Sequence, residues 1–378
     1  MPLTTTIFER MSALARETGA INLGQGFPDA EHAPELLAAA QRALAEKSNQ
    51  YPPMRGLPEL RQAVCDWYAR EQGLALTPEQ VIVTSGATEA LAASIFACIG
   101  PGDEAIILQP FYDAYLPLVE RAGGRAVVVS LEAPGWTLPL DRIAAAITPK
   151  TRAIILNTPN NPTGTLVTRA ELEGLAVLCE RHDLVLIADE VWEAMIFDGS
   201  AHLSPLHIAG LRERSVKIGS AGKIFSLTGW KIGWAVAAPH LAEAIAAQHQ
   251  FLTFTTATPL QWAVAEGLAL PGDWFARHRA IYAPRRVQMI EGLAAAGYVV
   301  LPSAGTWFVN VDLAASGLPA DDEAVAERLV REAGVATIPV SAFCGAEPMR
   351  GYLRFCFCKQ EAVLDDALSR LTDFRRRF

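Results

Sequence analysis

The chain has 378 residues, of which 51% are hydrophobic and 19% are charged, and its formal net charge is −9. This hydrophobic fraction can form a substantial core, which excludes a wholly disordered chain, and the length predicts two or three domains. The excess of acidic residues opposes binding to nucleic acid. The longest apolar stretch, residues 90–100, is too short to span a membrane, and the first residues lack a secretory apolar segment. We therefore expect a soluble cytoplasmic protein.

Residues 1–35 contain one short helical pattern and several turn residues. We expect them to form an N-terminal arm and part of a small domain. Residues 36–273 alternate short β-rich runs with amphipathic helical patterns, which predicts a large domain. The expected strands are 81–84, 105–108, 126–131, 153–157, 184–188, 216–220 and 233–237, and the expected helices are 87–98, 113–122, 168–182 and 240–250.

The apolar character of these runs favours an α/β fold with a mostly parallel seven-stranded sheet flanked by helices. From residue 274 to residue 378 the pattern changes, and we expect a smaller α+β domain. It begins with a long helix. The further expected elements are strands 299–301, 306–311 and 353–357 and helices 321–333 and 361–374.

The six cysteines and seven histidines show no spacing typical of a disulfide framework or a metal site. Cys356 and Cys358 alternate with phenylalanines in a strand-like run, which favours buried core thiols. We therefore expect no metal.

Polar residues follow several of the expected strands, at the sheet edge where doubly wound folds bind ligands. The segments are Ser85–Glu89, Gln109–Asp113, Thr158–Gly164, Asp189–Trp192 and Ser220–Lys223. The first opens a helix, and free backbone N–H groups at a helix start can bind a phosphate.

Each of these residues also has an ordinary structural explanation. Ser85 and Thr88 can cap a helix, Asp189 can form a structural ion pair, and Lys223 can be a surface charge. Tyr112 can be a packing aromatic. Their joint occurrence along one sheet edge instead matches pyridoxal phosphate, which needs an amine, a carboxylate, a phosphate site and a flat aromatic neighbour.

The chain resembles the class I/II aminotransferases of pyridoxal-phosphate fold type I, particularly the kynurenine and methionine aminotransferase branch. The resemblance runs nearly end to end. Its motifs include INLGQGFPD (21–29), TSGATEAL (84–91), NTPNNPTG (157–164), GSAGK (219–223) and YLRFCF (352–357).

By this resemblance, Lys223 is the Schiff-base lysine and proton shuttle, and Asp189 pairs with the pyridine nitrogen. Asn161 approaches the phenolic oxygen and the substrate carboxylate, and Tyr112 stacks on the ring. The phosphate is held by Gly86, Ala87, Thr88, Ser220 and Lys231. Tyr51 reaches the phosphate of the neighbouring subunit, which implies a homodimer with shared active sites.

The resemblance also assigns the substrate site. Arg354 grips the substrate carboxylate by a two-point contact, which a guanidinium provides and an ammonium does not. Gly26 lets the backbone approach that carboxylate. Phe8, and Phe254 from the partner subunit, are expected pocket walls, with ordinary core packing as the alternative. These walls favour aromatic, sulfur-containing or other uncharged substrates, and no second arginine motif marks a dicarboxylate specialist.

One position departs from the family pattern. The family usually has tyrosine three residues after the aspartate, and this chain has Trp192. Indole has one N–H donor and no acceptor. We expect Trp192 still to face the cofactor and to donate a hydrogen bond, with an altered pKa of the lysine–cofactor imine.

The expected activity is transfer of an amino group from an L-amino acid to a 2-oxo acid through a pyridoxamine form of the cofactor. Two alternatives remain at this point. A pyridoxal-phosphate C–S β-lyase acting on cysteine conjugates or cystathionine would share Lys223, Asp189 and Arg354. A non-catalytic pyridoxal-phosphate-binding regulator would carry an added DNA-binding region, and the chain shows no basic helix-turn-helix segment.

Overall fold

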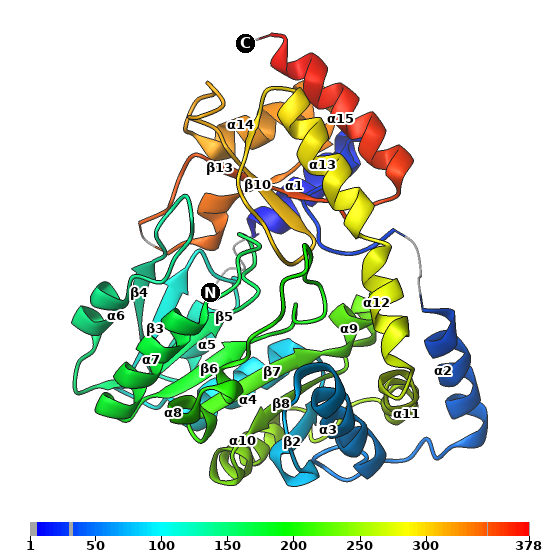
Figure 1. Ribbon diagram of the computed structural model, residues 1–378, viewed down its shortest axis with the longest axis vertical. Coiled ribbons are helices and arrows are strands. Elements are labelled where there is room, and N and C mark those ends of the chain that lie inside the picture. The colour runs from blue at the N-terminus through cyan, green and yellow to red at the C-terminus, as the bar shows by residue number, and fades with distance from the viewer. Residues whose placement is uncertain (1–5, 30–32, 346, 378) are drawn as a thin grey trace.

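The computed structural model describes residues 6–29, 33–345 and 347–377. In Figure 1 a large sheet with its helices fills the lower part of the molecule, and a smaller group of helices and strands lies above it. The blue helix α1 (Ile7–Thr18) lies in the upper part of the molecule with the yellow α13 (Ala283–Ala295) and the red α15 (Glu361–Arg375), and its Arg10 forms an ion pair with Glu323. The N-terminal segment therefore packs with the C-terminal part of the fold.

The large sheet has seven strands in the order β2-β8-β7-β6-β5-β3-β4. Only β8 runs against its neighbours, so the predicted mostly parallel sheet is confirmed. Its strands are β2 (Val81–Thr84), β3 (Glu104–Gln109), β4 (Arg125–Ser130), β5 (Thr151–Asn157), β6 (Val185–Asp189), β7 (Ser215–Ser220) and β8 (Gly233–Ala237).

The central strands are buried on both faces because helices cover both sides of the sheet. Successive side chains alternate between two core clusters: Ile107 and Ile155 pack on one face, and Ile106 and Ile154 on the other. The helices of this part are α2 (Pro34–Glu46), α3 (Pro58–Gln72), α4 (Ala87–Cys98), α5 (Tyr115–Arg121), α6 (Leu140–Ala146), α7 (Arg169–His182), α8 (Ala209–Arg212), α9 (Ala221–Ile224), α10 (Pro239–Leu252) and α11 (Thr258–Leu268).

The smaller unit is built on a four-stranded antiparallel sheet in the order β12-β13-β10-β9. A parallel pair joins β1, near the N-terminus, to β11 in this unit. The strands are β1 (Ile21–Asn22), β9 (Val299–Val300), β10 (Phe308–Asp312), β11 (Val335–Ala336), β12 (Ile338–Pro339) and β13 (Tyr352–Cys356). The exact limits of the two predicted domains stay a prediction.

Two helix predictions for this region were wrong in detail. The long helix expected after residue 273 is two helices, α12 (Gly272–Ala280) and α13, because Pro284 stands in the first turn of α13 and lacks the N–H that a continuous helix needs. The helix expected at 321–333 is α14 (Asp322–Arg328) followed by a π-helical turn, Leu329–Ala333. No helix in the described ranges is both long and apolar enough to cross a membrane.

The parallel pairing brings the predicted site residues together at one sheet edge. Asn157 at the end of β5 lies beside Asp189 at the end of β6, and Asp189 lies beside Ile218 of β7. Ser220 ends β7, and the short helix α9 that follows carries Lys223. The fold therefore delivers a carboxylate, a hydroxyl and an amine to neighbouring strand ends.

Candidate active site

A cavity of about 170 Å³ lies at the carboxyl ends of these strands. The predicted cofactor residues that line it are Gly86, Ala87, Thr88, Tyr112, Asn161, Asp189, Trp192, Ser220, Lys223 and Lys231. An adjoining cavity of about 230 Å³ shares Tyr112, Asn161, Trp192 and Lys223 with the first. The predicted substrate residues Phe8, Gly26 and Arg354 line this second cavity.

Lys223 lies where the two cavities meet. Its amine is 4.6 Å from the ring centre of Trp192 and 5.5 Å from that of Trp307. Burial lowers the pKa of this lysine to about 8, because the charged form loses its hydration. An amine with this pKa is partly unprotonated near neutral pH and can act as a nucleophile and as a proton acceptor.

Asp189 is buried at the end of β6. One carboxylate oxygen accepts a hydrogen bond from the Tyr115 hydroxyl, and the other accepts one from the Val191 N–H at 3.3 Å. Burial raises the pKa of Asp189 to about 6, while these two donors act in the opposite direction. The carboxylate remains predominantly ionised at pH 7 and can hold a proton on a ring nitrogen.

The start of α4 forms an anion site. Its cap residue, Gly86, has φ +76° and no side chain to accept from the first N–H groups of the helix, and Gly86, Ala87 and Thr88 line the cavity. A side chain at Gly86 would lie 3.1 Å from the amine of Lys231. The backbone at Gly86 and the Lys231 ammonium therefore lie close together, and this arrangement suits a phosphate.

Arg354 lies in β13 and is 3% exposed. It donates hydrogen bonds to Asn161 Oδ1 at 2.7 Å and to the Gly24 carbonyl, while its Nε is buried without a partner. Its guanidinium carbon is 3.9 Å from the ring centre of Phe308. Burial lowers the pKa of Arg354 to about 9, so it stays protonated at neutral pH. It is a buried cation suited to a carboxylate.

Two predicted residues lie outside these cavities of the same chain. Tyr51 and Phe254 contact each other edge to face, with ring centres 5.8 Å apart, and their exposed fractions are 83% and 42%. Tyr51 lines a separate surface groove that also contains Ser85, next to the phosphate loop. Their expected placement in a partner's site stays a prediction.

The sequence did not single out several residues that the structure brings to the site. Asn157 donates to the Asp189 carbonyl at 2.8 Å and accepts from the Asn161 N–H at 2.7 Å. Asn157 ends an apolar strand, and this position in the sequence could have identified it as a site residue. Tyr115, which contacts Asp189, lies three residues after Tyr112 in the same aromatic segment. Phe308 and Phe343, whose rings lie beside Arg354, were not among the expected site residues.

Comparisons with known proteins agree with this geometry. Residues 18–371 match the family model of aminotransferase class I and II. A probable N-succinyldiaminopimelate aminotransferase of Mycobacterium tuberculosis is 41% identical, over 100% of this chain and 98% of that protein. The methionine aminotransferase of Escherichia coli is 38% identical over 98% and 96% of the two chains. Its solved structure has a TM-score of 0.95, covering 98% and 97%.

The chain belongs to the class I and II aminotransferases. It is an enzyme, and its reaction is transfer of an amino group from an amino acid with pyridoxal phosphate as cofactor. The predicted fold type is confirmed, and the aminotransferase names of the relatives do not favour the lyase or regulator alternatives.

The residues of this aminotransferase fit the cofactor. The anion site at α4 suits the phosphate, Asp189 suits the ring nitrogen, and Lys223 suits the aldehyde carbon. Trp192 replaces the usual tyrosine and is 3% exposed, with its ring 4.9 Å from Trp307. It lines the same cavity as Lys223 and Asp189, and its position facing the cofactor and its hydrogen bond to the cofactor stay predictions.

We predict that the cofactor-free Lys223→Met variant is more stable than the wild-type aminotransferase at pH 7, by roughly 1–3 kcal/mol. The pKa of Lys223 falls from 10.5 to about 8 on folding. Below pH 8 the amine is charged in both states, and the folded state bears the full cost of burying it. As pH rises from 8 towards 10.5 this cost disappears. Urea unfolding at pH 7 and pH 9.5 should show the difference narrowing, whereas the exposed control Lys150→Met should show no such trend. A stability difference between Lys223→Met and wild type that is the same at both pH values would contradict the prediction.

Proposed function

We propose that this aminotransferase prefers L-amino acids with aromatic, sulfur-containing or other uncharged side chains and passes the amino group to a 2-oxo acid. The observation that carries the proposal is Arg354, a buried cation among aromatic rings. Besides Phe308, its guanidinium carbon lies 4.7 Å from the ring centre of Phe343 and 5.8 Å from that of Phe8. A substrate held by its carboxylate at Arg354 places its side chain beside these rings.

An acidic residue in the same cavity supports this choice. Asp113 lines the cavity with Arg354, and burial raises the pKa of its carboxyl above the ordinary value. Its ionised form would repel a second carboxylate on a substrate. The aromatic walls and Asp113 together favour uncharged side chains over dicarboxylates.

The proposed roles of the remaining residues follow from their positions. Bound pyridoxal phosphate supplies an electron-accepting ring that stabilises negative charge at the substrate Cα. Lys223 would hold this group through its Nζ, and once the substrate amine has taken its place the freed Nζ would accept the proton from Cα. Asp189 holds the ring nitrogen protonated. Tyr112 covers one face of the ring and Asn161 orients the substrate carboxylate together with Arg354.

The phosphate is proposed to bind in the cradle at the start of α4. Its donors are the backbone and side-chain groups of Gly86, Ala87, Thr88, Ser220 and Lys231. The backbone of Gly26 passes so close to Phe308 that a Cβ there would lie 2.5 Å from the ring. This glycine is proposed to let the chain run close to the substrate carboxylate.

The enzyme is proposed to act as a homodimer with shared sites. Several large apolar side chains are exposed on Tyr51 and around the end of α10: Tyr51, Phe251, Leu252 and Phe254. Tyr51 lines a groove with Ser85 of the phosphate loop and contacts Phe254. Exposed groups of this kind mark an association surface. Tyr51 and Phe254 would complete the site of the partner, where Tyr51 reaches the phosphate and Phe254 lines the substrate pocket.

The cytoplasm is the proposed location. All six cysteines are free thiols, four of them buried, and thiols remain reduced in that compartment.

We predict that the wild-type enzyme loaded with pyridoxal phosphate converts phenylalanine or methionine to the matching 2-oxo acid in a single half-reaction, without releasing ammonia. A lyase would release ammonia with pyruvate from a cysteine conjugate, and a regulator would do neither. The Lys223→Ala variant should lose turnover, and borohydride should no longer fix the cofactor to the chain. The Lys150→Ala control should retain both. Fixation at another lysine would contradict the assignment.

For Arg354→Ala we expect amino-acid binding to weaken by about 2–5 kcal/mol, because a desolvated charge pair is lost. Arg354→Lys should recover only part of this energy, since an ammonium lacks the two-point geometry. Half-reaction rates measured against amino-acid concentration give the apparent affinity. Arg350→Ala, at a 48% exposed arginine just before the same strand, is the matched control. Unchanged affinity in Arg354→Ala would remove this residue from the substrate site.

Site sharing can be tested by mixing two variants, Lys223→Ala and Tyr51→Ala. If Tyr51 acts in the partner's site, each mixed dimer contains one intact site and one doubly altered site. Random mixing should then restore about a quarter of wild-type activity. If Tyr51 acts within its own subunit, or if the enzyme is a monomer, mixing restores nothing. Sedimentation of each variant checks that the dimer persists.

A further inference from the structure

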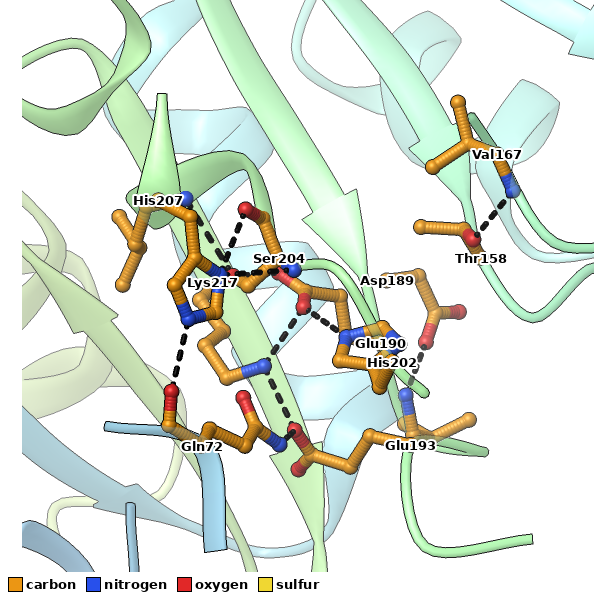
Figure 2. A network of polar contacts seen from close by, with 12 residues as sticks. Gln72, Thr158, Val167, Asp189, Glu190, Glu193, His202, Ser204, His207 and Lys217 are labelled. Atoms are coloured by element: carbon orange, nitrogen blue, oxygen red, sulfur yellow. Dashed lines mark hydrogen bonds and ion pairs between the residues drawn. The ribbon is translucent and has the colours of Figure 1, made fainter. Parts of the chain in front are cut away.

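A buried cluster of charged side chains lies next to the active site, on β7 and on the turn after β6 (Figure 2). Lys217 of β7 places its Nζ 2.6 Å from Oε2 of Glu190 and 2.6 Å from Oε2 of Glu193. None of the three side chains has any exposed surface. One ammonium therefore joins two carboxylates that lie three residues apart in the chain.

Neutral donors complete the shells of both carboxylates. Glu190 accepts from the Ser204 hydroxyl at 3.0 Å, and Glu193 accepts from the Tyr68 hydroxyl at 2.8 Å and from the Gln72 amide at 2.7 Å. His202 also contacts Glu190. Because every carboxylate oxygen has a partner, the cluster holds one arrangement.

The cluster also contains side chains of the kinds that bind metal ions. Glu190, Glu193 and His202 bring their ligand atoms within 4.8 Å of one another, a spacing that could hold a metal ion. The Lys217 ammonium already bridges the two carboxylates. In this protein the cation of the cluster is a lysine side chain.

A buried ion cluster is a poor source of stability, because desolvation of the charges offsets most of their attraction. We therefore looked for its effect in the position of the neighbouring chain. Glu190 and Glu193 flank Val191 and Trp192 in a turn that starts directly after Asp189. The turn is also held by the Glu190 N–H, which donates to the Ile218 carbonyl at 3.0 Å, and by the Glu193 N–H, which donates to the Glu190 carbonyl at 2.9 Å.

We propose that Lys217 is a positioning residue of the active site. By holding Glu190 and Glu193 together it fixes the turn that follows Asp189 and carries Trp192, and so aims the Asp189 carboxylate at the ring nitrogen of pyridoxal phosphate. Lys217 touches neither cofactor nor substrate and acts through Asp189. The proposal rests on the function proposed above for Asp189.

The test compares two ligands that differ only at the ring nitrogen. Equilibrium dialysis measures the affinity of the cofactor-free protein for pyridoxal phosphate and for a carbocyclic analogue with C–H in place of that nitrogen. Lys217→Met keeps the length of the side chain and removes its charge, and the exposed Lys150→Met is the control. Lys217→Met should weaken binding of pyridoxal phosphate by about 10–100-fold, the range for loss of a partner that orients a ligating side chain. Binding of the analogue should change by less than about 3-fold, because Asp189 has no ring nitrogen to meet.

Equal losses for both ligands would mean that Lys217 supports the whole pocket, and this result would overturn the proposal, as would unchanged binding of both. If Lys217→Met does not fold, Glu193→Gln removes one of the two clamped charges and should give the same selective pattern with a smaller loss. A wild-type protein that binds the two ligands equally contradicts the role of Asp189 itself. That result identifies a failure of the proposed function, because it is seen before Lys217 is changed.

Discussion

The structure depends on keeping two opposite charges, Asp189 and Lys223, inside one cavity that excludes much of the water. Burial disfavours both charged forms, raising the pKa of the acid to about 6 and lowering that of the amine to about 8. Between these values the acid is largely ionised while the amine is still partly protonated. The neighbouring ends of β6 and β7 place both groups in the wall of a cavity, where they are buried but can still contact a ligand.

The large sheet and the smaller sheet contribute different groups to the site. The large sheet supplies the groups proposed to hold the cofactor and act on it, from the ends of β5, β6 and β7 and from the start of α4. The smaller sheet brings Arg354 on β13 and Phe308 on β10 to the adjoining cavity, where the substrate is proposed to bind, with Phe8 of α1 added from the N-terminal segment. Asn161 connects them, because it lines both cavities and accepts a hydrogen bond from Arg354. A catalytic site therefore exists only where the two parts meet, although each has its own sheet.

The sequence predicted the strands of the large sheet well because a strand buried on both faces is a continuous apolar run, and its end is marked by the first polar residue. The same rule located Asp189 and Ser220. Two features were missed for different reasons. The break between α12 and α13 was overlooked although Pro284 marks it. The partnership of Tyr115 with Asp189 has no local signal, because it depends on packing between separate elements. Lys217 is the clearest case, since a lysine within a strand pattern reads as an exposed edge. Only the pairing of β6 with β7 places it among acidic residues.

The charge of Lys217 has a second consequence besides holding the turn. Glu190 follows Asp189 directly, and its negative charge raises the pKa of Asp189. An uncompensated Glu190 would therefore favour the protonated form of Asp189, which cannot stabilise a protonated ring nitrogen. The ammonium lies 2.6 Å from the Glu190 carboxylate and lowers the pKa of that acid, which keeps the cluster ionised as a unit. Geometry and electrostatics thus act in the same direction: the arrangement that aims the Asp189 carboxylate also offsets the charge that would neutralise it.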